Sequence, residues 1–186
     1  MPRITSRLLI TGCWRPDLHA DESGVLVPAE RLADALLDPA YERDGISFLG
    51  GEPMQQPHGL LALVQSLRAK GCSHLVCYTG YTYEALVRRA RREPTIAQIL
   101  DALDILVDGP YIAALAAAAG MWTGSGNQRV IDLVATRRTG GIVLYQTAEG
   151  EPPTKRCTSW ATLAPAATMH LGVLLNAVSQ AGWLTK

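Results

Sequence analysis

At residues 45–54 the chain reads Gly45-Ile46-Ser47-Phe48-Leu49-Gly50-Gly51-Glu52-Pro53-Met54, a short apolar run that ends in two glycines, a carboxylate and a proline. The apolar run is too short for a helix and contains β-branched and aromatic side chains, which predicts a buried strand. Gly50 and Gly51 allow a sharp turn and a close ligand, because neither has a Cβ. Glu52 follows at the carboxyl end of the strand, where α/β sheets and barrels bind ligands. The alternative is a strand that simply turns and caps the next helix.

The composition is that of one globular domain without a strong net charge. The chain has 186 residues, 48% of them hydrophobic and 18% charged, and 17 basic residues balance 17 acidic ones. This length can bury one core, and the charge balance gives no field that would recruit nucleic acid or an anionic membrane. The first residues do not resemble a signal peptide, and no apolar stretch reaches the roughly 20 residues of a membrane span. We therefore expect a cytoplasmic protein whose cysteines are reduced thiols.

Apolar periodicity predicts strands that alternate with helices along the first two thirds of the chain. The expected strands are residues 7–12, 46–49, 74–80 and 104–111, and the expected helices are residues 28–37, 59–71, 82–89 and 96–103. This order predicts a parallel sheet with crossover helices. The carboxyl ends of such strands meet at one edge, so their polar turns favour a binding site there. Residues 113–119 are expected to form a short helix and residues 169–181 a terminal helix, with a further strand at residues 141–145.

Four motifs occur in the chain in this order: Phe48-Leu49-Gly50-Gly51-Glu52-Pro53, Tyr78-Thr79-Gly80-Tyr81-Thr82-Tyr83-Glu84-Ala85-Leu86, Leu106-Val107-Asp108-Gly109-Pro110-Tyr111 and Gly124-Ser125-Gly126-Asn127-Gln128-Arg129. Together they resemble the radical S-adenosylmethionine (SAM) activating-enzyme family, most closely the anaerobic ribonucleotide reductase activases and their relatives with a single 4Fe–4S cluster. The resemblance implies an α/β fold, a partial parallel (β/α) barrel of radical SAM type. It covers residues 8–133 of a single domain, residues 1–186, and leaves the extension 136–186 without an assigned role.

The resemblance also implies where SAM binds. In that family the Gly-Gly-Glu-Pro segment cradles the methionine end of the cofactor, and Glu52 would help to receive the α-amino group, which suits a carboxylate at a strand end. The implied cofactor-binding residues are Gly50, Gly51, Glu52, Pro53, Tyr78, Thr79, Asp108, Asn127, Gln128 and Arg129. Asp108 either binds a ribose hydroxyl or caps the turn before Pro110. Residues 127–129 either contact the cofactor or a partner, or pin their loop by hydrogen bonds to the backbone.

The cluster motif departs from the family's pattern. The family places three cysteines as C-x3-C-x2-C after the first strand, because three thiolates leave one iron free to chelate the cofactor. Here Cys13 stands at the first position, whereas Asp17 and Ala20 stand at the second and third. An alanine cannot ligate iron and a carboxylate replaces a thiolate poorly, so the sequence predicts the loss of the 4Fe–4S cluster. Cys13, Asp17 and His19 are candidates for a mixed site that would suit zinc, and a solvated loop is the alternative.

Three functions are compatible with these residues. In the first, which we favour, the chain binds SAM without a cluster and uses it in non-radical transfer or cyclisation, since the sulfonium is itself an electrophile. In the second, it is a non-catalytic scaffold or binding subunit of a radical enzyme system. In the third, it is a still-active activase of glycyl-radical type with a rebuilt cluster site. The expected partners are small-molecule SAM and a protein, with no nucleic acid and no membrane.

Overall fold

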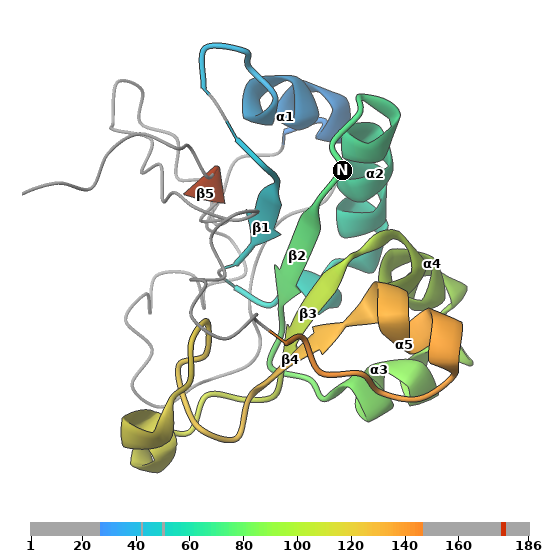
Figure 1. The fold of residues 1–186 in the computed structure, drawn as a ribbon. Coiled ribbons are helices and arrows are strands. Elements are labelled where there is room, and N and C mark those ends of the chain that lie inside the picture. Colours follow the sequence, from blue (N-terminus) through green and yellow to red (C-terminus); the bar gives the residue numbers. More distant parts are fainter. Residues whose placement is uncertain (1–26, 42, 50, 147–175, 178–186) are drawn as a thin grey trace, which may run out of the picture.

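The computed structural model describes residues 27–41, 43–49, 51–146 and 176–177 (Figure 1). The predicted first strand at residues 7–12, the candidate metal ligands Cys13, Asp17 and His19, and Gly50 lie outside the described residues. Most of the predicted terminal helix also lies outside them. Within the described part no helix is long and apolar enough to cross a membrane.

The fold is built on an open five-stranded sheet in the order β4-β3-β2-β1-β5. Its strands are β1 (Ile46–Phe48), β2 (Leu75–Tyr78), β3 (Ile105–Asp108), β4 (Arg129–Asp132) and β5 (Asn176–Ala177). β1, β2 and β3 are parallel, with Phe48 opposite Cys77 and Tyr78 opposite Val107. β4 and β5 pair antiparallel with β3 and β1, respectively. The central three strands therefore direct their carboxyl ends to one edge.

The α/β class is confirmed, and the three described strands that the sequence predicts, β1, β2 and β3, are parallel as expected. The sheet as a whole is mixed and not parallel throughout, because two antiparallel edge strands, β4 and β5, were not predicted. An apolar run does not encode the direction in which a strand pairs, and β4 returns beside β3 without a crossover helix. The helix predicted over residues 169–181 is also wrong at residues 176–177, which form the antiparallel strand β5. Leu144, in the strand expected at residues 141–145, forms only an isolated bridge with Ile131. The partial barrel is not confirmed, because the described sheet is open.

Four of the five α-helices in the described part of the chain lie close to their predicted positions, whereas α5 was not predicted. The helices are α1 (Ala29–Leu36), α2 (Pro57–Ala69), α3 (Tyr83–Ala90), α4 (Pro94–Ala102) and α5 (Leu133–Thr139), with 3-10 turns η2 (Pro53–Gln55) and η3 (Ala113–Ala118). Local signals explain their starts. The Thr82 hydroxyl accepts from the Ala85 amide at 3.3 Å and the Asp132 carboxylate from the Ala135 amide at 2.8 Å, which satisfies amides that a helix start leaves unpaired. Pro57 and Pro94 occupy the first helical position, where no amide is needed.

The main core lies between the sheet and its helices, which cover one face (Figure 1). The strands contribute to it alternate buried side chains: Ile46, Phe48, Leu75, Cys77, Leu106 and Ile131. Val76, Ile105 and Val107 point to the opposite face and form a smaller cluster, as the two-residue period of a strand requires. Trp122 and Tyr145 pack against this second cluster and stack with ring centroids 5.9 Å apart. The sheet thus has buried side chains on both faces.

Gly45 allows the close approach of backbones that starts the β1–β2 pairing. A Cβ at this position would lie 2.4 Å from the His74 carbonyl oxygen, which also accepts the Ile46 amide at 2.9 Å. We expect Gly45→Ala to lower the free energy of unfolding by about 2 kcal/mol, because the backbones must separate. Gly141→Ala is the control, since its Cβ would meet nothing within 4 Å, and it should change stability by less than about 0.5 kcal/mol. Urea denaturation measures both, and equal effects would contradict this account.

Candidate functional site

A buried carboxylate, that of Glu52, joins the carboxyl ends of β1 and β2. Its Oε1 accepts hydrogen bonds from the Met54 amide at 2.9 Å and from the Thr79 hydroxyl at 2.8 Å. Its Oε2 accepts from the Gly80 amide at 2.7 Å. Glu52 is 2% exposed, so these three donors replace the water that the carboxylate loses on burial.

The hydrogen bonds leave Glu52 little capacity for a ligand. Each carboxylate oxygen accepts about two hydrogen bonds, so Oε1 is saturated and Oε2 can accept one more. Burial raises the pKa of Glu52, while the three hydrogen bonds and the charge of Arg89 oppose that rise. Gly51 precedes it with a φ of 56°, a left-handed conformation that favours glycine. The turn therefore requires the glycine that the sequence places there.

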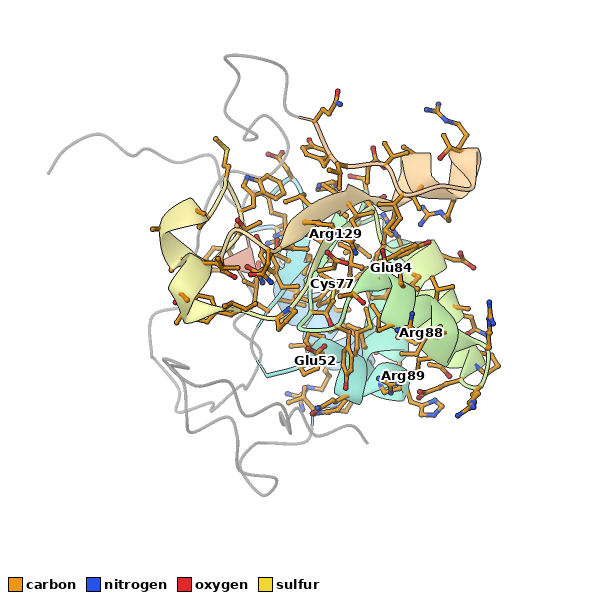
Figure 2. All side chains as sticks on the ribbon, turned by 90° about the horizontal axis from the view of Figure 1, so that it is seen from below. Glu52, Cys77, Glu84, Arg88, Arg89 and Arg129 are labelled. Atoms are coloured by element: carbon orange, nitrogen blue, oxygen red, sulfur yellow. The ribbon has the colours of Figure 1, made fainter. Side chains whose placement is uncertain are left out.

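Arg89 of α3 holds the same loop from the helix side. Its Nη1 donates to the Met54 carbonyl at 2.7 Å and its Nε donates to Glu93 at 2.8 Å. The guanidinium also lies over the Tyr81 ring, 5.8 Å from its centroid. Glu52 and Arg89 lie at the same end of the molecule in Figure 2. The loop after β1 is thus fixed by side chains from two directions.

A second buried carboxylate, Asp108 at the end of β3, is paired with Arg129 of β4. The two residues lie opposite each other in the antiparallel ladder. Arg129 Nε donates to Asp108 Oδ1 at 2.9 Å, and its Nη2 donates to Oδ2. Asp108 Oδ2 also accepts the Tyr83 amide at the start of α3, at 2.7 Å. Asp108 is 1% exposed and acts as a structural junction between β3, β4 and α3.

Arg129 also binds Glu84, which lies beside it in Figure 2. Its Nη1 and Nη2 donate to the two carboxylate oxygens of Glu84 at 3.0 Å and 2.9 Å. These hydrogen bonds lower the pKa of Glu84 to about 2. Hydrogen bonds to Asp108 and Glu84 raise the pKa of Arg129, so the guanidinium stays charged at every accessible pH. The charge of Arg129 is therefore divided between two carboxylates.

Two amide side chains pin the long return loop between β3 and β4. Gln128 Nε2 donates to the Gly109 carbonyl at 2.9 Å, and its Oε1 accepts the Gly124 amide at 2.7 Å. Asn127 Nδ2 donates to the Pro110 carbonyl at 2.7 Å, and its Oδ1 accepts the Ser125 hydroxyl at 2.8 Å. Both residues therefore hold their own loop by hydrogen bonds to the backbone, which is one of the two alternatives that the sequence left open. Their contact with a cofactor stays a prediction.

The structure brings most of the predicted site residues to one edge of the sheet. Glu52, Thr79 and Asp108 lie at the carboxyl ends of β1, β2 and β3. Pro53 begins η2 in the same loop as Glu52. Tyr78 instead packs against the cluster of Val76, Ile105 and Val107 on the face opposite the helices.

Three residues at this edge were not among the predicted ones. Glu84 lies within the motif at residues 78–86 and Arg89 lies just after it. Both are in end turns of α3, where a charged side chain is ordinary, so the sequence does not single out either one. Gln56, at the end of the loop after β1, has a side-chain amide whose two polar atoms are buried without a hydrogen-bond partner in the described part of the chain. The proximity of Gln56 to the Gly-Gly-Glu-Pro segment is the signal that could have found it.

The described cysteines do not form a metal or cluster site. Cys72 and Cys77 are buried free thiols, and burial raises the pKa of both. They lie five residues apart near opposite ends of β2, a separation on the order of 15 Å in extended chain. No group of three or more His, Cys, Asp or Glu among the described residues could hold a metal ion. Cluster ligands from this chain must therefore lie outside the described residues, where Cys13 and Cys157 stand.

The two partners of Arg129 predict unequal mutational effects. Arg129→Met leaves Asp108, which is 1% exposed, without its counter-charge, and we expect a loss of about 3 kcal/mol in the free energy of unfolding. Glu84→Gln breaks only the outer pair, in which the Glu84 side chain is 46% exposed, and should cost less than about 1 kcal/mol. Guanidinium denaturation measures both. Equal losses would show that Asp108 does not depend on Arg129.

The Glu84 pair also predicts a pH dependence. The folded pKa of about 2 lies below the ordinary value of 4.5, so the pair stabilises the fold above pH 4.5 and loses its contribution as the pH falls toward 2. The difference in unfolding free energy between the wild type and Glu84→Gln should be constant above about pH 5 and shrink below it. Urea titrations at a series of pH values measure this difference. A difference that grows on acidification would contradict the assigned pairing.

Comparisons with known proteins agree with the resemblance. A family described as a 4Fe-4S single cluster domain matches residues 8–131. The chain is 33% identical over 145 residues to the anaerobic ribonucleoside-triphosphate reductase-activating protein of Salmonella typhimurium, which covers 69% of this chain and 88% of that protein. It is 32% identical over 126 residues to the protein of the same name from Escherichia coli, which covers 64% of this chain and 77% of that protein. No solved structure matches the chain significantly.

These matches correct two predictions made from the sequence. A cluster-free SAM enzyme of non-radical chemistry is wrong as the main function, because the matched family is a 4Fe-4S domain and the relatives are reductase-activating proteins. The predicted loss of the 4Fe–4S cluster is overturned by the same findings. Both predictions rested on Asp17 and Ala20, which stand where the family has cysteines. The family match extends over residues 8–131 despite these two positions. The chain belongs to the 4Fe-4S single cluster domain family and, with it, to the radical SAM activases.

Proposed function

We propose that this protein activates an anaerobic ribonucleotide reductase, and that it binds SAM at the edge formed by β1, β2 and β3. The observation that carries the proposal is the match over residues 8–131 together with the likeness to the reductase-activating proteins of Salmonella typhimurium and Escherichia coli. The proposed function is the third of the three that the sequence allows, an activase with a rebuilt cluster site. Its expected location is the cytoplasm.

The chemistry of the strand ends supports SAM as the ligand. SAM carries a sulfonium, an ammonium and a carboxylate, so its net charge is positive. The remaining acceptor site on Glu52 suits an ammonium. Gly50, Gly51 and Pro53 would shape the turn around that group.

The rest of the predicted site would act mainly by positioning. The hydroxyl of Thr79 orients Glu52. Gln128 and Asn127 hold the loop that follows Asp108, and Arg129 holds Asp108 itself. Tyr78 would contribute the floor of the site from the face opposite the helices.

The return loop supports a protein partner. Ile112, Leu115 and Met121 are 40%, 39% and 60% exposed, and all three lie in the loop that begins directly after Asp108 and Gly109. Apolar side chains that gather on one exposed loop favour a protein contact. The reductase would dock there, beside the proposed SAM site.

A 4Fe–4S cluster would also need cysteine ligands. Three thiolates hold a site-differentiated 4Fe–4S cluster, and the described residues do not fit this need, because Cys72 and Cys77 are buried and apart. Cys13 is the ligand that matches the family's pattern. The remaining ligands of the rebuilt site would come from Cys157 or from another chain.

Anaerobic reconstitution tests the proposed function. The full chain, incubated with iron and sulfide under argon, should take up about four iron atoms per chain and convert SAM to 5′-deoxyadenosine when reduced. Cys13→Ser should lower the iron content, whereas Cys72→Ser should leave it unchanged, because Cys72 is buried in the core. A wild-type protein that takes up no iron and yields no 5′-deoxyadenosine would overturn the proposal.

A further inference from the structure

Four arginines line one surface hollow at the junction of α3 and α4, which we call the arginine hollow. It has a volume of about 530 Å³, and its lining consists of Arg88, Arg89, Arg91, Arg92 and Glu93. Arg88 and Arg89 belong to the last turn of α3 and are labelled in Figure 2, and the other two precede α4. Small-ligand sites enclose roughly 300–1,000 Å³. The hollow therefore has room for a small ligand and a clear excess of positive charge.

Three of the four guanidinium groups are uncommitted. Arg89 Nε donates to the carboxylate of Glu93 at 2.8 Å, so the one negative charge of the lining is already paired. The side chains of Arg88, Arg91 and Arg92 are exposed, and within the described residues their guanidinium groups have neither a hydrogen bond nor an ion pair. These three groups are therefore available to an anion.

The end of α3 does not require these arginines as caps. Cations are common at a helix C-terminus, where they complement the dipole and can bind the last carbonyls. Here the Arg89 carbonyl instead accepts the backbone amides of Arg92 and Glu93, each at 3.0 Å. Arg91 keeps a helical conformation, with φ −64° and ψ −26°, so it lies three residues after Arg88 on one face, where like charges repel. A bound anion would offset this repulsion.

The composition of the lining favours phosphate groups as the anion. A guanidinium matches a phosphate with two parallel hydrogen bonds, and three guanidinium groups call for several phosphates in a row. The positive end of the α4 dipole also lies here, because this nine-residue helix begins at Pro94, directly after Glu93. The described lining contains no aliphatic or aromatic side chain, so it offers a protein segment none of the apolar anchoring that dominates protein interfaces.

We propose that the arginine hollow binds a polyphosphate chain, with Arg88, Arg91 and Arg92 donating hydrogen bonds to its phosphate oxygens. Arg89 would act by positioning, because its bond to Glu93 keeps that carboxylate away from the ligand. The chain of phosphates belongs either to a nucleoside triphosphate or to free inorganic polyphosphate. The inference goes beyond the proposed function and does not rest on it, since the three donors lie outside the proposed SAM site.

Calorimetric titration of inorganic triphosphate into the full chain at low ionic strength tests the site. The wild type should show saturable binding, and Arg91→Gln/Arg92→Gln should bind at least tenfold more weakly, because it removes hydrogen bonds between charged groups. Arg31→Gln/Arg138→Gln is the matched control. It removes the same charge from exposed positions on α1 and α5 and should bind within about twofold of the wild type. Arg88→Gln is a second, independent variant and should also weaken binding.

A parallel titration of ATP distinguishes the two sources of the phosphates. Equal affinities for ATP and inorganic triphosphate would show that the phosphate chain alone is recognised. Tighter binding of ATP that is lost in Arg91→Gln/Arg92→Gln would identify a nucleotide, and either result supports the proposal. Without ligand, this variant should melt at the wild-type temperature or higher, because it removes exposed like charges.

Three outcomes would overturn the inference. The first is a wild type without saturable binding of triphosphate. The second is equal weakening in the two double variants, which would mean attraction by net charge without a site. The third is a hexaglutamate peptide that binds more tightly than triphosphate, which would indicate an acidic protein partner. SAM affinity should be the same in the wild type and Arg91→Gln/Arg92→Gln, so each of these outcomes leaves the proposed function intact.

Discussion

The site depends on one buried carboxylate and the three donors around it. Glu52 lies in a region of low dielectric, where an ionised group without partners is costly. Its bonds to Met54, Thr79 and Gly80 therefore oppose any separation of the loops that follow β1 and β2. The same bonds fix the turn at Gly51 and the Met54 carbonyl that Arg89 binds. The protein's own hydrogen bonds thus fix the edge of the sheet, and under the proposed function this order would lower the entropy cost of binding.

The sequence predicts that Glu52 lies at a strand end, because that signal is local. It does not predict the pairing of Asp108 with Arg129, because that pairing depends on the direction of a distant strand. A short apolar run followed by two glycines is a local signal, and it places a strand end wherever it occurs. The direction of β4 is decided by a distant contact, since the return loop between Gly109 and Gln128 brings β4 back antiparallel to β3. That direction puts Arg129 opposite Asp108. If the sheet is assumed to be parallel, Arg129 is not placed opposite Asp108. From the sequence alone, both side chains are therefore expected to be free to bind a ligand.

The polar residues of the motifs show a second limit of sequence reasoning. Asn127 and Gln128 have the same hydrogen-bonding groups whether they bind a ligand or a backbone carbonyl. Only the observed hydrogen-bond partners distinguish the two cases. Here the side-chain amides of Asn127 and Gln128 donate to the backbone carbonyls of Pro110 and Gly109. Gln56 is the opposite case, because it belongs to no motif that the sequence singles out and its buried amide has no partner within the described residues. Residue type alone therefore predicts a polar edge, and only the structure shows which of its polar groups are already paired.

The charged side chains at this edge are paired with one another. A ligand here would therefore be selected by the geometry of its hydrogen bonds and not by a strong electrostatic field. Arg129 is bound to Asp108 and Glu84, and Arg89 is bound to Glu93 and the Met54 carbonyl. A phosphate group, which needs uncommitted cations or free backbone amides, would find these two arginines occupied. SAM, the proposed ligand, carries an ammonium that needs a hydrogen-bond acceptor. Under the proposed function, Glu52 would offer the one acceptor position that its three hydrogen bonds leave open. Under the proposed function, such a site would discriminate by hydrogen-bond match, because an analogue without the amino group would leave the open acceptor position of Glu52 unpaired.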